Sequence, residues 1–136
     1  MIECLGTEGT VFMYTSYERG VIKRLIELFP DLEPPLQAII DRLYDLAKVV
    51  EDHYYHPDMG GSWSIKKVIP AMVPHMSYTN LEGINEGMAA SNGYLEAIDP
   101  NTTPERKAEL EQQLLQYCRF DTEAMVEIVQ YLRMNG

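Results

Sequence analysis

Two acidic side chains and one tyrosine are the residues best placed to do chemistry in this 136-residue sequence. Tyr117 precedes Asp121 by four residues in LLQYCRFDTEAMVEIV, and this spacing places both side chains on one face of a helix. Glu18 follows VFMYTSY, in the first turn of another expected helix. Carboxylate oxygens suit Mg²⁺ or Mn²⁺. Each acid also has a structural role available, because a carboxylate early in a helix interacts favourably with the helix dipole.

A second stretch, HYYHPDMGGSWSIKK, offers groups that could contact nucleic acid. Lys66 and Lys67 are two of only 11 basic residues, and Ser64 begins an expected helix whose free N–H groups favour a phosphate. Trp63 or Tyr55 could stack on a base.

The same stretch has two other interpretations. It is a structural turn if Gly60 and Gly61 supply positive φ and the aromatic rings pack. A metal cluster of His53, His56 and Asp58 is the less favoured alternative, because the proline and glycines interrupt the helix there.

Composition limits the classes of function. The chain has 21 acidic and 11 basic residues and a net charge of -10, which argues against non-specific coating of DNA but not against a nuclease with a carboxylate site. No apolar run approaches the length of about 20 residues that spans a bilayer, so we expect no membrane segment. Cys4 and Cys118 form no CxxC pair, and we expect reduced thiols in a cytoplasmic protein, with Cys118 buried as a small apolar side chain.

The local patterns predict one short strand and about five helices in a single domain, residues 1–136. The strand is TVFMYT, residues 10–15. Helical periodicity and capping residues indicate helices over residues 16–29, 33–56, 64–73, 81–98 and 101–133. A lone strand cannot satisfy its own backbone groups, so we expect it to pair with a second copy or with strands outside this chain.

Two segments together resemble a known superfamily. VFMYTSYERGVIKRL and YCRFDTEAMVEIV are similar to the second and third acidic motifs of 3′–5′ exonucleases, the tyrosine subtype of the DEDD branch of the ribonuclease H-like superfamily. The HPDMGGSWSIKKVIPAMVP block, with YCRFDTEAM, resembles a bacterial family of domains of unknown function assigned to that superfamily, over nearly the whole chain. The chain looks like the C-terminal part of such a domain, a helix-rich α/β fragment without the first strands.

The resemblance carries over residue by residue. Tyr117 and Asp121 match the Tyr-x-x-x-Asp of the third motif. In the second motif, Glu18 stands in place of Asp, Tyr17 in place of Phe, and Thr15 in place of Asn. The first motif, Asp-x-Glu on an opening strand, is missing. The Asp-x-Glu of residues 31–33 follows a helix instead.

The resemblance implies phosphodiester hydrolysis with two divalent ions, about 3.5–4 Å apart, held by four carboxylates. Glu18 and Asp121 would be ligands of Mg²⁺ or Mn²⁺, and Tyr117 would orient the attacking water. DNA or RNA would be the substrate, contacted by Tyr17, Ser64, Lys66 and Lys67. Because the first motif is absent, we expect little hydrolysis by this chain alone.

The alternative function is a non-catalytic interaction module that kept the fold and lost the chemistry. Thr15 in place of Asn and Glu18 in place of Asp favour it. A self-associating helical module, paired through the strand across a two-fold axis, is the third possibility.

Overall fold

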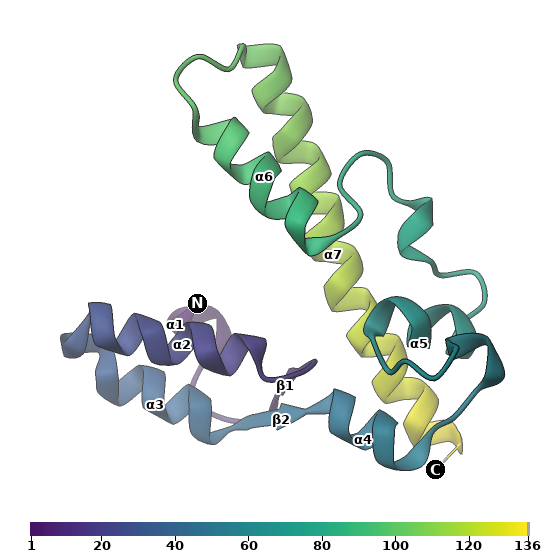
Figure 1. Cartoon of the computed structure of the whole chain (residues 1–136). Coiled ribbons are helices and arrows are strands. Elements are labelled where there is room, and N and C mark those ends of the chain that lie inside the picture. The colour runs from purple at the N-terminus through teal and green to yellow at the C-terminus, as the bar shows by residue number, and fades with distance from the viewer. Residues whose placement is uncertain (136) are drawn as a thin grey trace. The chain divides into compact units, whose positions relative to one another are not determined.

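The expected helix-rich α/β class is confirmed in a computed structural model, which describes residues 1–135 (Figure 1). Seven α-helices and one two-stranded sheet make up the regular structure of these residues. The chain divides into two compact units, Met1–Ile65 and a second unit that begins at Lys66. No helix within residues 1–135 is long and apolar enough to cross a membrane.

The first unit contains four helices and both strands, with short 3₁₀ turns at Pro30–Leu32 and Pro57–Met59. In chain order its elements are α1 (Ile2–Leu5), β1 (Val11–Met13), α2 (Tyr17–Leu28), α3 (Glu33–Asp41), β2 (Leu43–Asp45) and α4 (Leu46–His53).

Strand β1 pairs with β2 in parallel, with Val11 opposite Leu43 and Met13 opposite Asp45. Two expectations were therefore wrong. Residues 33–56 do not form one helix, and the strand is not alone in the chain. Helices α2 and α3 make the long connection that two parallel strands require. Self-association consequently no longer follows from an unpaired strand.

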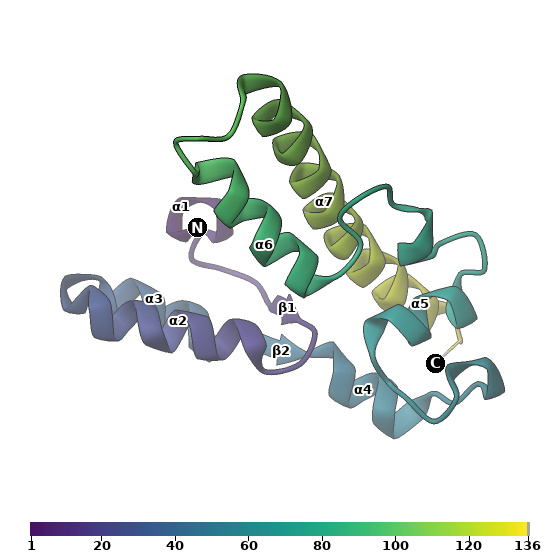
Figure 2. The same ribbon diagram turned by 45° about the horizontal axis from the view of Figure 1, so that its top comes forward.

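The core of the first unit lies between α2 and α3, which run side by side in Figures 1 and 2. Its buried residues are Ile22, Leu36, Ile39 and Ile40. Arg42, just after α3, fixes the N-terminal segment, because its guanidinium donates to the carbonyl oxygens of Leu5 at 2.9 Å and Glu8 at 2.8 Å.

The second unit consists mainly of a helical hairpin. Its elements are most of α5 (Ile65–Met72), a 3₁₀ turn at Tyr78–Asn80, α6 (Gly87–Ile98) and α7 (Pro104–Asn135). Helices α6 and α7 pack side by side around Ile84, Ala97 and Leu110 (Figures 1 and 2). The hydroxyl oxygen of Thr103 accepts the N–H of Arg106 at 3.3 Å and so caps the start of α7.

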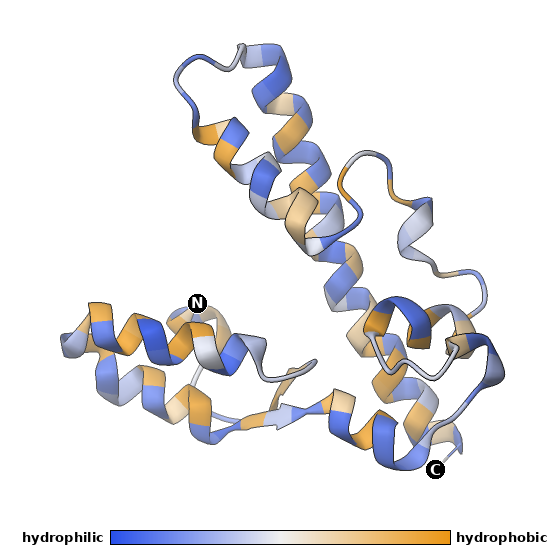
Figure 3. Cartoon of the chain, viewed as in Figure 1, coloured by the Kyte–Doolittle hydropathy of each residue, from blue (hydrophilic) through white to orange (hydrophobic). Residues whose placement is uncertain are grey.

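Helix α7 runs for 32 residues without interruption and carries both Tyr117 and Asp121. Hydrophilic and hydrophobic turns alternate along it in Figure 3. Such a pattern is typical of a helix that buries one face and exposes the other.

Candidate functional site

The structure places Asp121 in a cluster of polar and aromatic side chains in the second unit. Asp121 is half-buried, and its Oδ1 accepts a hydrogen bond from the hydroxyl of Tyr78. Tyr78 lies in the 3₁₀ turn between α5 and α6 and is only 4% exposed. We name Lys66, Tyr78, Tyr117, Phe120 and Asp121 the Asp121 cluster.

The ring of Tyr78 lies at the centre of the Asp121 cluster. Its centroid is 4.6 Å from that of Phe120, at an edge-on angle of 66°, and 6.1 Å from that of Tyr117. The Nζ of Lys66 lies 5.8 Å from the Tyr78 centroid, within range of a cation–π contact. Side chains from α5, the 3₁₀ turn and α7 therefore meet around Asp121.

Burial controls the electrostatics of the cluster. It raises the pKa of Asp121, while the Tyr78 hydrogen bond and the positive charge of Lys66 act in the opposite direction. The pKa of Tyr117 is also raised, first by burial and then by the nearby charge of Asp121. Tyr117 thus keeps its proton near neutral pH and can act as a hydrogen-bond donor rather than as a base.

A single carboxylate can hold a divalent ion only with help from other oxygen ligands. An ionised carboxylate has about four acceptor positions, so the bond from Tyr78 leaves capacity for a cation at Asp121. Within residues 1–135, no three His, Cys, Asp or Glu side chains are grouped as a metal site. A divalent ion at Asp121 would need water, phosphate oxygens or another carboxylate to complete its shell.

In the first unit, Glu18 lies in the first turn of α2, just after the carboxyl end of β1. It is half-buried, whereas its neighbour Tyr17 is 76% exposed. Glu18 and Asp121 belong to different units. Their convergence on one pair of metal ions stays a prediction.

The turn before Glu18 has an unusual backbone. Thr15 has a φ of 70°, and its N–H donates to Asp45 Oδ1 at 3.0 Å. The same oxygen accepts the N–H of Ala47 at 2.9 Å and caps α4. Asp45 thus links the ends of both strands. The sequence did not indicate this role, because Asp45 fell inside the helix expected over residues 33–56.

The residues of HYYHPDMGGSWSIKK that we expected to bind substrate differ in how exposed they are. Ser64, the last residue before α5, is exposed, and so is Lys67. Lys66 is half-buried and belongs to the Asp121 cluster.

The contacts of the loop between α4 and α5 are those of a structural turn. Gly60 and Gly61 have φ values of 59° and 77°, as the turn interpretation requires. The indole N–H of Trp63 donates to the carbonyl oxygen of Tyr54 at 3.0 Å. The carbonyl oxygen of Trp63 accepts from the hydroxyl of Tyr14 at 2.6 Å. These bonds hold Trp63 between the residue that follows β1 and the residue that follows α4, while Tyr55 remains exposed.

Residues 1–64 match the family model described as Domain of unknown function (DUF2779). The match includes Glu18 and Asp45 and ends before α5. We had expected likeness to such a family over nearly the whole chain. A search of curated proteins and a search of solved structures each found no match.

Tyr117 and Asp121 lie outside the DUF2779 match, as does Tyr78, the residue that sequence reasoning missed. Tyr78 precedes Asp121 by 43 residues, so no helical spacing connects them. The expectation that Cys118 is buried was also wrong. It is exposed on α7, because a residue adjacent to the half-buried Tyr117 points to a different side of the helix.

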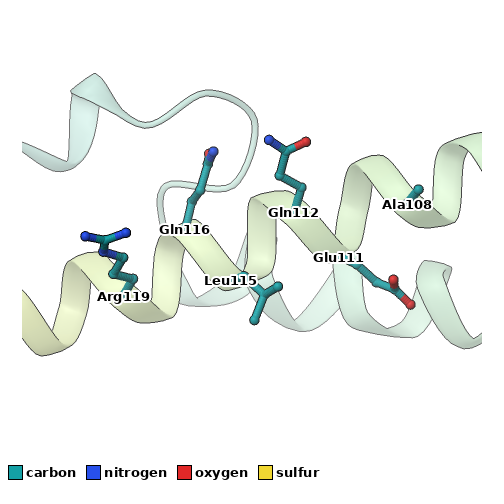
Figure 4. Close-up of a pocket in the computed structure, with 6 residues that line it drawn as sticks. All are labelled: Ala108, Glu111, Gln112, Leu115, Gln116 and Arg119. Atoms are coloured by element: carbon teal, nitrogen blue, oxygen red, sulfur yellow. The ribbon is translucent and has the colours of Figure 1, made fainter.

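Helix α7 also has a shallow hollow beyond the DUF2779 match, shown in Figure 4. Six residues of this one helix line it: Ala108, Glu111, Gln112, Leu115, Gln116 and Arg119. Gln112 and Gln116 point to the same side, and Leu115 points away from them (Figure 4). Glu111 is the single acid and Arg119 the single basic residue among these six.

Proposed function

We propose that this chain is part of a divalent-metal-dependent 3′–5′ exonuclease-like domain that acts on the phosphodiesters of nucleic acid. The observation that carries the proposal is the half-buried Asp121, with Tyr117 one helical turn before it and the charge of Lys66 near enough to influence its pKa. In such a reaction a carboxylate can hold a divalent ion, a protonated phenol can orient water and an ammonium group can contact a phosphate.

Each residue has a role in the proposal. Asp121 and Glu18 are ligands of Mg²⁺ or Mn²⁺, and Tyr117 orients the attacking water through the proton that its raised pKa retains. Lys66 and Lys67 contact phosphate groups of the substrate. Tyr17, exposed beside Glu18, and Ser64, exposed before α5, are further contacts to the nucleic acid.

The proposal includes membership in the ribonuclease H-like superfamily, which the two acidic motifs support. The Asp-x-Glu motif that would supply two further carboxylates from a strand is missing from residues 1–135, because their Asp31-x-Glu33 lies in the 3₁₀ turn and the start of α3. We therefore propose metal binding with little hydrolysis by this chain alone, because two of four carboxylates hold poorly the metal ions that stabilise the entering and leaving oxygens.

A Mn²⁺ titration followed by NMR tests the proposal on the full chain. Paramagnetic broadening is expected around Asp121 and Glu18, and Asp121→Asn is expected to abolish the broadening in α7. Asp52→Asn, an exposed acid paired with Lys48 at 3.4 Å, is the matched control and should leave the pattern unchanged. Broadening that persists in D121N, or that is centred elsewhere, would refute the metal role of Asp121. If both acids hold the same ions, Glu18→Gln should also weaken the broadening at Asp121.

A non-catalytic interaction module is the second candidate, and the surface of α6 favours it. Met88, Leu95 and Ile98 follow one face of α6 and are 69%, 61% and 56% exposed. Apolar side chains grouped on a helix face often mark a contact surface. Light scattering over a dilution series should then show association that Leu95→Glu abolishes, and a monomer at every concentration would argue against self-association.

A further inference from the structure

Helix α7 has a second face, on the side away from the core of the hairpin. Leu110, Leu114 and Tyr117 pack in the cluster that α7 shares with α6. The other side of the helix carries the exposed residues that line the hollow of Figure 4. We name them the Leu115 face: Ala108, Glu111, Gln112, Leu115, Gln116 and Arg119. Leu115 lies near the middle of this face and is 72% exposed, although its side chain is large and apolar.

The charges of the Leu115 face are complementary to themselves in one orientation. Glu111 precedes Leu115 by four residues, and Arg119 follows it by four. When two such helices run antiparallel and meet at Leu115, Glu111 of each lies across from Arg119 of the other. When they run parallel and in register, equal charges meet. Like charges across an interface are destabilising, so the pattern selects the antiparallel pair.

We propose that the Leu115 face binds the same face of a second copy of this chain, antiparallel and about a two-fold axis at Leu115. A two-fold interface uses one surface patch twice, so that residue i contacts j and j contacts i. Leu115 of each copy would be buried against the other at the axis, with a Glu111–Arg119 pair on either side. The proposal is independent of the metal site proposed above.

Arg119 has hydrogen-bond donors left for this contact. Within its own helix, its Nε donates to Glu123 Oε1 at 2.9 Å. A guanidinium group carries five N–H donors in a planar fork, so the two Nη groups can bind the Glu111 carboxylate of the second copy. Arg119 would then lie between two carboxylates, and such a network of charges contributes more than an isolated surface pair.

The contact is short, which sets the expected strength of the dimer. Thr122 lies across from Ala108 in the antiparallel pair, and the helix between these two residues is about 20 Å long. A contact of this length belongs with the small, transient interfaces that bury less than about 1,200 Å². We therefore expect a weak dimer that forms at high protein concentration and dissociates further as salt is added, because its charged pairs lie at the surface.

Reversal of single charges tests the pairing on the full chain. Arg119→Glu and Glu111→Arg each place like charges across the axis, and sedimentation equilibrium should show dimers weakened about 10- to 100-fold. An equimolar mixture of R119E and E111R restores opposite charges at both positions, so it should form heterodimers about as strongly as the unaltered chain. Arg133→Glu makes the same change of charge at an exposed position outside the Leu115 face, and it should leave the dimer unchanged.

Disulfide cross-linking tests the orientation. Ala108 and Thr122 are both exposed and lie seven residues to either side of Leu115. In a chain that also carries Cys4→Ser and Cys118→Ser, a mixture of Ala108→Cys and Thr122→Cys should give disulfide-linked heterodimers on mild oxidation. Efficient linking of either variant to itself, without linking in the mixture, would show a parallel pair and overturn the inference.

The remaining outcomes are equally decisive. Leu115→Glu places two carboxylates at the axis and should abolish the dimer, whereas Leu95→Glu on α6 should not. A monomer at every concentration overturns the inference, and so does a dimer that persists in L115E. Association that L95E abolishes and L115E leaves intact would assign the contact to α6 instead. A mixture of R119E and E111R that associates no better than either variant alone would also overturn it, because the charge pairing would then be absent.

Discussion

Thr15 has a backbone conformation that β-branched residues rarely adopt. A φ of 70° lies in the left-handed region, where a branched side chain costs of the order of 1–3 kcal/mol. The hydrogen bond from its N–H to Asp45 holds the turn in this conformation. The turn determines where α2 begins, and so where Glu18 lies.

Replacement of Thr15 by glycine should relieve this strain. We expect Thr15→Gly to raise the free energy of unfolding by about 1 kcal/mol, since glycine adopts positive φ without a steric penalty. Ser16→Gly is the matched control, because Ser16 has a φ of -87° and gains nothing from glycine. Urea denaturation measures both. Equal effects of the two substitutions would show that Thr15 is not strained.

The stability of the chain should depend on pH through Asp121. Its pKa is raised above the usual 3.8, mainly by burial, so the folded chain binds this proton more tightly than the unfolded chain does. The sign follows from linkage: stability falls as pH rises from the unfolded pKa through the folded one, and remains lower above it. Asp121→Asn removes the group, so the stability of the unaltered chain relative to D121N should decrease over that pH range.

The charge of Lys66 lowers the pKa of Asp121, so removal of that charge should raise this pKa further. Titration of the Asp121 carboxyl carbon by NMR should show a higher midpoint in Lys66→Met. Lys67→Met, which changes the exposed neighbouring lysine, should leave the midpoint of Asp121 where it is. A lower midpoint in K66M, or an equal rise in K67M, would contradict the placement of Lys66 beside Asp121.

At the scale of elements, the sequence predicts those helices and strands whose own residues show a clear local pattern. Strand β1 was predicted from the β-branched and aromatic residues that follow a glycine, and helix α2 from apolar residues that recur at helical spacing. Strand β2 was missed because Leu43 continues the helical apolar spacing of Leu36, Ile39 and Ile40. The strand forms through pairing with β1 more than 30 residues away, and helical periodicity carries no information about that contact.

In the candidate site, too, the sequence predicts relations within one element and misses contacts between elements. Tyr117 and Asp121 share α7, and their spacing was enough to relate them. Tyr78 reaches Asp121 only because the 3₁₀ turn packs on α7, and Asp45 reaches Thr15 only because the strands pair. Contacts between elements are set by packing, so a single sequence leaves them undetermined.

Two glycines in helices should respond oppositely to alanine. Gly20 in α2 has open space where a Cβ would lie, so Gly20→Ala should stabilise by about 1 kcal/mol through helix propensity. Gly93 in α6 faces the hairpin core, and a Cβ there would lie 2.7 Å from Cδ1 of Ile84. Because Ile84 is 4% exposed and has little room to move, overpacking of about 1–3 kcal/mol should exceed the helix-propensity gain of Gly93→Ala, and thermal and urea unfolding should show a net destabilisation.

A double-mutant cycle identifies the cause of the Gly93 effect. Ile84→Val removes Cδ1, so it should recover part of the loss when it is combined with Gly93→Ala, although alone it costs about 0.5–1.5 kcal/mol. Strictly additive effects would mean that the tight contact between α6 and Ile84 is not what destabilises G93A.

At the scale of the whole molecule, each compact unit has a hydrophobic cluster of its own. The first is built on α2 and α3, and the second on α6 and α7. Units of about 65 to 70 residues are near the lower limit at which a single core is sufficient for folding. A single domain, as the sequence predicts, would unfold in one cooperative step, whereas two units could unfold separately.

Core truncations should affect mainly the unit in which they lie. Ile39→Ala in the first cluster and Leu110→Ala in the second remove well-buried side chains and should each cost about 2–5 kcal/mol locally. Amide hydrogen exchange should then quicken chiefly in α2 and α3 for I39A, and chiefly in α6 and α7 for L110A, because each cluster stabilises its own helices. Equal loss of protection in both units for either variant would show that the chain unfolds as one cooperative domain.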